Sequence, residues 1–215
     1  MHTGLVALGG KEALMIGNGI AAVVVAYLLG SISGAYLATR LMAGKDIRKL
    51  GGGNAGARNV YREVGLKAAI PAAIIDAGKG ALAVVIADFV LGAQQPFLAL
   101  SALAVVAGHI WPIFLKFSGG SGLSPAIGAL LLLLTQELLV ILGIMLVLTV
   151  VTRNPVLSLN IGFISLPVSA WFFEKSPLAV LFSILLIAIM VINFIPTAKA
   201  ALAEAGSPQK LMADL

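Results

Sequence analysis

Long apolar runs separated by short polar segments dominate this chain. Each run is close to the roughly 20 residues that a helix needs to cross a bilayer, and backbone groups in lipid must be paired within the helix itself. The pattern therefore predicts an all-α membrane protein with about seven transmembrane helices. The predicted spans are residues 15–39, 68–91, 97–117, 123–136, 138–153, 156–173 and 178–195.

The fourth and fifth spans are short and are separated by little more than Thr135, Gln136 and Glu137. An alternative in which one of them is re-entrant or strongly tilted therefore stays open.

Composition supports an integral membrane protein. The chain is 60% hydrophobic and 11% charged, with a mean hydropathy of +1.07, which is too apolar for an ordinary soluble domain. No alternating pattern typical of a β-barrel occurs. We expect a single polytopic membrane domain over residues 1–215, whose first apolar run is a retained span and not a signal peptide.

Lysine and arginine predict the orientation. Residues 40–67 carry seven of them, whereas residues 92–96 carry none. Because such residues are retained in the cytoplasm, the 40–67 loop and the 198–215 tail should be cytoplasmic and the N-terminus outside. The net charge of +5 does not indicate nucleic-acid binding, because no soluble basic domain with interleaved aromatic residues is present.

The cytoplasmic loop contains the glycine-rich stretch of residues 51–65, which reads GGGNAGARNVYREVG. Glycines let successive N–H groups surround an anion, and basic and amide side chains add donors. The candidate phosphate-binding residues are Gly53, Asn54, Arg58, Asn59 and Arg62. A flexible polar linker is the alternative. A dinucleotide fold is improbable, because no strand precedes the glycines.

Asp76 and Lys79 lie three residues apart within the second span and so share one helical face. Charges inside a span are costly and usually face the protein interior, so Lys79 is a candidate phosphate ligand. The alternative is a mutually neutralising pair that fixes helix packing. In the first span, Gly30 and Gly34 have the spacing that lets helices approach closely.

His109 precedes a second glycine-rich loop at residues 117–122, which contains Gly119 and Gly120. A histidine there can act as a base or orient a phosphate, which makes it the candidate catalytic residue. It can equally be a buried residue bonded to a carbonyl freed by Pro112. No metal site is expected, because the chain has two distant histidines and no cysteine.

In order along the chain, these motifs resemble the bacterial acyl-phosphate:glycerol-3-phosphate acyltransferase family, known as PlsY. The residues of 51–65 resemble GSGNxGxTNxxRxxG, Asp76, Lys79 and Gly80 match DxxKG, and residues 108–122 match GHxxPxFxxFxGGxG. The resemblance implies a multi-pass protein of the bacterial cytoplasmic membrane. It also implies acyl transfer from an acyl phosphate to glycerol 3-phosphate in phospholipid synthesis, with no metal or other cofactor.

The chain departs from the family pattern at several polar positions. Gly52 replaces a serine, Arg58 a threonine, and Ser118 and Ser121 two lysines. In the closing segment Phe194 and Thr197 stand approximately where the family has histidine and asparagine. Because a lysine lost from a phosphate site removes a full charge, we expect a divergent member with an impaired or altered active site.

Membrane lipids, glycerol 3-phosphate and an acyl phosphate are the expected partners. The alternative function is a non-catalytic accessory subunit of a larger membrane complex, which uses the same scaffold for protein, lipid or quinone contacts. Its smooth leucine-rich helices, such as residues 130–134 and 181–192, give this alternative its motivation.

Overall fold

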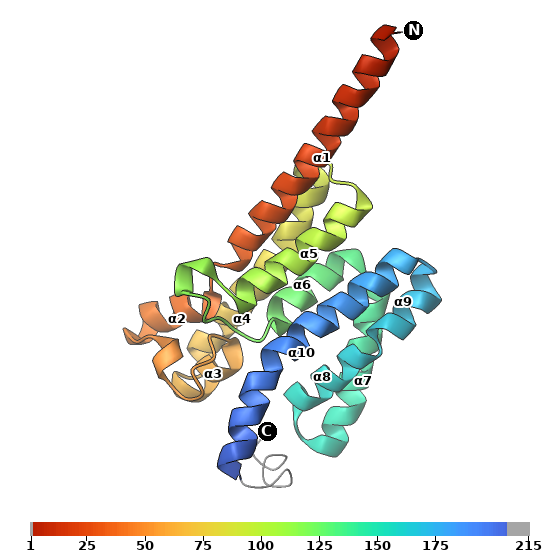
Figure 1. Ribbon diagram of the computed structural model, residues 1–215. Helices are drawn as coiled ribbons and strands as arrows, with labels where there is room; N and C mark the ends of the chain where they lie inside the picture. Colours follow the sequence, from red (N-terminus) through yellow and green to blue (C-terminus); the bar gives the residue numbers. More distant parts are fainter. Residues whose placement is uncertain (1, 206–215) are drawn as a thin grey trace. The chain divides into compact units, whose positions relative to one another are not determined.

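Helices form the whole architecture of residues 2–205, the part of the chain that a computed structural model describes (Figure 1). Within that part the chain divides into two compact units, with the boundary between Leu133 and Leu134.

The first unit pairs α1 with α5 and α4 with α6, and carries short helices on its connecting segments. Figure 1 shows the segment after α5 beside α2 and α3. The elements are α1 (His2–Gly30), α2 (Gly34–Ala43), η1 (Ile47–Lys49), α3 (Ala57–Glu63), α4 (Leu66–Val85), η2 (Ile86–Val90), α5 (Gln95–Ile110), η3 (Ile113–Leu115) and α6 (Leu123–Leu133).

The second unit begins with the antiparallel pair α7 (Thr135–Thr152) and α8 (Pro155–Ile164), and continues with α9 (Leu166–Glu174) and α10 (Pro177–Ala205). The Asn154 side chain caps α8 by accepting from the Leu157 N–H at 3.1 Å. Glu137, predicted to separate two spans, lies instead in the first turn of α7 and is fully buried. The predicted tail is helical as far as Ala205, and residues 206–215 lie outside the described part.

Five helical segments of residues 2–205 are long and apolar enough to cross a bilayer, and the bent α8–α9 pair makes six if it counts as one span. This confirms an all-helical, multi-pass membrane protein. The 11 residues of α6 rise only about 16 Å against a hydrocarbon core of about 30 Å. The count of seven spans and the orientation remain predictions.

The first predicted span, 15–39, is broken in the structure. α1 ends at Gly30 and α2 begins at Gly34, so residues 31–33 interrupt the helical hydrogen bonds. Ser33 caps α2, since its Oγ accepts from the Tyr36 N–H at 3.1 Å. Such a break inside a span needs other partners for the backbone groups it frees.

Glycines let α1 and α5 approach closely. A Cβ on Gly30 would collide with the Val105 carbonyl, and one on Gly108 would collide with the Tyr27 carbonyl. The Tyr27 hydroxyl adds a bond across the same contact by donating to the Trp111 carbonyl oxygen at 2.9 Å. The prediction that Gly30 serves helix packing is confirmed.

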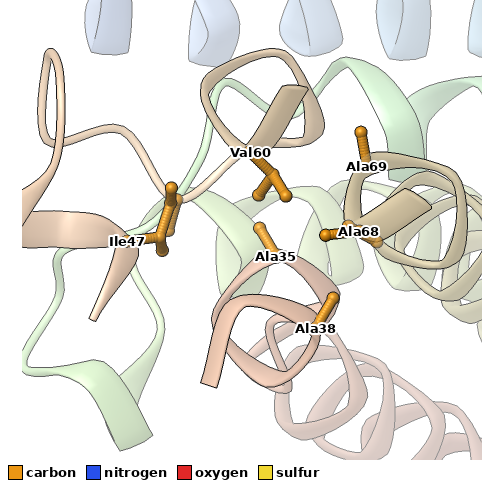
Figure 2. Close-up of a cluster of buried hydrophobic side chains, with 8 residues drawn as sticks. Ala35, Ala38, Ile47, Val60, Ala68 and Ala69 are labelled. Atoms are coloured by element: carbon orange, nitrogen blue, oxygen red, sulfur yellow. The ribbon is translucent and has the colours of Figure 1, made fainter. Parts of the chain in front are cut away.

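A cluster of small buried side chains holds the basic segment against the helices. Figure 2 shows residues of α2, η1, α3 and α4 meeting in this cluster, with Ile47 and Val60 as its largest members. Both are fully buried, although each lies in a segment predicted to be a polar loop. The residues are Ala35, Ala38, Ile47, Ala55, Val60, Ala68, Ala69 and Ala72.

We predict that Gly108→Ala lowers the free energy of unfolding by about 1–3 kcal/mol, because the new methyl group overpacks the α1–α5 contact. Thermal unfolding of the purified protein in detergent measures this change. The control is Gly78→Ala in α4, where nothing lies within 4 Å of the added Cβ, so helix propensity alone should make it neutral or slightly stabilising. Equal melting temperatures for the two variants would contradict the packing argument.

Candidate functional site

A buried ion pair lies at the centre of the first unit. Lys79 Nζ contacts Asp76 Oδ1 at 2.7 Å, and the two side chains are 6% and 0% exposed. Both residues lie on α4, one turn apart, as their spacing predicts. The pair faces the protein interior and not lipid.

This ion pair supplies partners for the break between α1 and α2. Lys79 Nζ donates to the Ile32 carbonyl oxygen at 2.6 Å, and the Gly34 N–H donates to Asp76 Oδ1 at 3.0 Å. Ile32 and Gly34 are where the chain leaves one helix and enters the next, so the Ile32 carbonyl and the Gly34 N–H lack helical partners. The charges on α4 therefore satisfy the polar groups that the break exposes.

His109 completes the cluster, because its Nδ1 lies 3.0 Å from Lys79 Nζ. The same Nδ1 lies 3.5 Å from Asp76 Oδ1. Beside a charged Lys79, which has three N–H donors and no acceptor, Nδ1 accepts and the ring proton lies on Nε2, whereas a protonated Nδ1 would donate to Asp76. With the Ile32 carbonyl, Asp76 and His109 as acceptors, Lys79 uses all three donors. The arrangement favours a positioning role for Lys79 over direct contact with a phosphate. One carboxylate oxygen, Asp76 Oδ2, is buried without a hydrogen-bond partner.

Backbone bonds join the two glycine-rich loops next to this cluster. The Ala55 N–H donates to the Gly119 carbonyl oxygen at 3.0 Å, and the Gly120 N–H donates to the His109 carbonyl oxygen at 3.0 Å. A Cβ on Gly120 would collide with His109 Nε2. The structure thus joins the two loops, and His109, only 3% exposed, lies directly under the second loop.

Asn59 holds the first loop in shape. Its Nδ2 donates to the carbonyl oxygens of Ile47, Leu50 and Asn54 at 3.3, 3.0 and 3.0 Å. These bonds engage the amide donors that the sequence analysis assigned to a ligand. In this structure Asn59 therefore acts on the loop itself.

The remaining candidates of the first loop lie closer to solvent. Asn54 and Arg62 are exposed, and Arg58 is half-buried. Burial lowers the pKa of Arg58, and the neighbouring positive charge of Arg62 lowers it further. An anion beside this pair would relieve that repulsion. Gly53, with φ of 72°, adopts the left-handed conformation that the turn requires.

Sequence reasoning did not identify Arg48 as a site residue. Its Nη1 donates to the Leu115 carbonyl oxygen at 2.8 Å, which connects the first loop to the segment that begins the second. The hydrogen bond to Arg48 lowers the pKa of Asp46, and the same bond raises the pKa of Arg48. No spacing rule relates residue 48 to residue 115, so the sequence carried no signal for this contact.

The positions that the sequence analysis expects to differ from the family pattern are mostly accessible. Gly52, Ser118 and Phe194 are exposed and Ser121 is half-buried, while the side chain of Thr197 lies outside the described part. Within residues 2–205, no group of three or more histidine, cysteine, aspartate or glutamate side chains could hold a metal ion.

Comparison with known proteins places this chain in a recognised family. A family model described as glycerol-3-phosphate acyltransferase matches residues 20–204. Glycerol-3-phosphate acyltransferase 1 of Dehalococcoides mccartyi is 40% identical, over 88% of this chain and 94% of its own length. The glycerol-3-phosphate acyltransferase of Rhodopseudomonas palustris is 39% identical, over 80% of this chain and 86% of its own length.

Solved structures agree with the sequence matches. A crystal structure of PlsY, an integral membrane glycerol 3-phosphate acyltransferase in its glycerol 3-phosphate form, superposes with a TM-score of 0.77 and 27% identity, covering 86% of this chain and 92% of that one. The lysophosphatidic acid form of PlsY superposes with a TM-score of 0.75 and 26% identity, with the same coverage.

We predict that Lys79→Met lowers the free energy of unfolding by about 3–5 kcal/mol, because it leaves a buried carboxylate unpaired. Adding Asp76→Asn removes that unpaired charge and should recover about 1–3 kcal/mol. Unfolding of the two variants in detergent measures both changes. A double variant no more stable than Lys79→Met would contradict the assignment of a compensated ion pair.

Proposed function

This chain belongs to the glycerol-3-phosphate acyltransferase family, and we propose that it transfers an acyl group from an acyl phosphate to glycerol 3-phosphate in the membrane. The observation that carries the proposal is the pair of glycine-rich loops joined by the Ala55 to Gly119 bond above His109. The likeness to a glycerol 3-phosphate form and a lysophosphatidic acid form of PlsY supports the same acceptor and product here.

The proposed reaction needs positioning more than a strong base. A glycerol hydroxyl oxygen bonds to the acyl carbonyl carbon, the bond from that carbon to the phosphate oxygen breaks, and the departing phosphate can take the hydroxyl proton. Lysophosphatidic acid and inorganic phosphate are the products. Because an acyl phosphate is already activated, holding both substrates and neutralising their charge can provide much of the acceleration.

We assign direct phosphate contact to Asn54, Arg58 and Arg62 of the first loop. Gly53 in the first loop and Gly119 and Gly120 in the second shape the backbone that brings these groups to the phosphate. The repulsion between the two guanidinium groups supports this assignment, because a bound dianion would offset it. Asn59, Lys79 and His109 take positioning roles, since their polar groups already bind other parts of the protein.

The departures from the family pattern lead us to propose a slower enzyme. Ser118 and Ser121 lack the ammonium groups that lysines would bring to the second loop, and Gly52 lacks a hydroxyl in the first. A hydrogen bond to a charged group contributes about 1.5–3 kcal/mol. One missing lysine contact therefore corresponds to roughly a tenfold to hundredfold loss of rate.

The deciding experiment follows lysophosphatidic acid formed from palmitoyl phosphate and labelled glycerol 3-phosphate by the purified protein. We predict slow formation by the unmodified protein, and a rise of about tenfold or more in Ser118→Lys or Ser121→Lys. Gln94→Lys, which adds the same charge at an exposed position in another connection, should leave the rate unchanged.

Two outcomes would change the proposal. A fast unmodified protein that neither lysine accelerates would confirm acyl transfer and contradict the impairment. No product from any variant would overturn acyl transfer itself and favour the accessory-subunit alternative. Mass analysis of the gently solubilised protein would then be expected to find a stoichiometric partner.

We also propose the orientation inferred from the positive charges, with the N-terminus outside, the 40–67 segment and the tail cytoplasmic, and α6 as the fourth of seven crossings. The chain has no cysteine, so one introduced thiol reports on one position. With a membrane-impermeant maleimide, Gln94→Cys should label in intact cells, whereas Gly52→Cys should label only after permeabilisation. Both positions are exposed. The reverse labelling pattern would contradict this topology.

A further inference from the structure

We propose that Arg48 is a positioning residue that fixes the second glycine-rich loop at a set distance from the first. The inference rests on the proposed function, in which the two loops together shape the phosphate site. It concerns the geometry between the loops, so it can be tested without any acyl transfer.

The segment where the second loop begins has an unusual backbone conformation. Lys116 and Phe117, with φ of 54° and 61°, are consecutive non-glycine residues in the left-handed region. Side chains rarely adopt this conformation, and it persists where surrounding contacts impose it. The turn has local bonds, since the Phe117 N–H donates to the Pro112 carbonyl oxygen at 2.9 Å and the Ser118 N–H to the Leu115 carbonyl oxygen at 3.3 Å.

Arg48 adds a contact from outside the turn at the point where the left-handed pair begins. Its Nη1 donates to the Leu115 carbonyl oxygen at 2.8 Å, and Leu115 is the residue directly before Lys116. The direction in which the chain leaves Leu115 helps to set where Gly119 and Gly120 lie, together with their bonds to Ala55 and His109. A bond to the Leu115 carbonyl can therefore help to orient the second loop.

The guanidinium is itself held in place before it reaches Leu115. Its Nε and Nη2 donate to the two carboxylate oxygens of Asp46 at 3.0 and 2.7 Å. The group also stacks 5.4 Å from the centroid of the Tyr36 ring. Between Asp46 and Arg48, the fully buried Ile47 anchors the segment in the cluster of Figure 2.

This geometry requires an arginine. A planar guanidinium offers separate donors in fixed directions, two for the Asp46 carboxylate and one for Leu115, whereas a lysine ammonium is a single point charge on a flexible stem. Arg48→Lys keeps the charge and much of the buried stem. The lysine should nevertheless be unable to bind the Asp46 carboxylate and the Leu115 carbonyl oxygen at the same time.

The first test measures the distance between the loops. Nitroxide labels on Gly52→Cys and Ser118→Cys, one exposed position in each loop, report it through their dipolar coupling. One narrow distance distribution is expected with Arg48, and a broad or longer one with Arg48→Lys or Arg48→Ala. Arg40→Ala is the matched control, because Arg40 is an exposed arginine bonded only locally, to the Gly44 carbonyl oxygen. An unchanged distribution in both Arg48 variants overturns the proposal, whether or not the protein transfers acyl groups.

The second test uses the rate of acyl transfer. A misplacement of about 1 Å can cost as much as a hundredfold in rate, so we expect Arg48→Lys to lower kcat by at least about tenfold while its melting temperature stays close to that of the unmodified protein. Added ethylguanidinium should restore part of the lost rate to Arg48→Ala and none to Arg40→Ala. A rate loss that tracks only the loss of melting temperature, with no rescue, would show a merely structural role and overturn the inference.

Discussion

The contact between the Asp76–Lys79 pair and the break between α1 and α2 is the interaction on which the first unit depends. A membrane-spanning helix that stops and restarts leaves a carbonyl and an N–H without partners where water is scarce, and each such group costs several kcal/mol if it stays unpaired. Here the Lys79 ammonium donates to the Ile32 carbonyl oxygen, and the Asp76 carboxylate accepts from the Gly34 N–H. The two charges neutralise each other at the same time. One turn of α4 therefore carries two buried charges and also pairs the backbone groups that the break exposes.

The consequences of that contact extend to the candidate site. Lys79 Nζ also contacts Nδ1 of His109, and the His109 carbonyl oxygen accepts from the Gly120 N–H. A buried cluster therefore supports the second glycine-rich loop. This arrangement suits a reaction in which the protein must place two charged substrates and contributes little covalent chemistry of its own.

Much of the architecture was predictable, because the physics of lipid acts on the average properties of long segments. Composition and run length predicted a helical, multi-pass protein, and ordered motifs indicated the family, which the comparisons confirm. Details that depend on contacts between distant residues were not predictable. Hydrophobicity averaged over a window of residues does not distinguish the break at residues 31–33 from a continuous span. The same averaging did not show that Glu137 lies in the first turn of a helix.

The candidate site was also only partly predictable from the sequence. Glycine content identified the two loops, and residue type identified the charged and amide side chains in and near them. The sequence could not show which of those side chains form hydrogen bonds within the protein, as Asn59 and Lys79 do. Arg48 was missed because its partner is a backbone carbonyl 67 positions away, and every residue type has such a carbonyl.

The close contact between Gly120 and His109 has a consequence for how such a site can be altered. The path of the second loop depends on backbone bonds, on the Arg48 contact and on the absence of a side chain at Gly120, while Ser118 is exposed and Ser121 is half-buried. The shape of the second loop and its charge therefore depend on different residues. One framework can then accept ligands of different charge by exchanging two side chains, which makes this loop a natural starting point for redesigning what the protein binds.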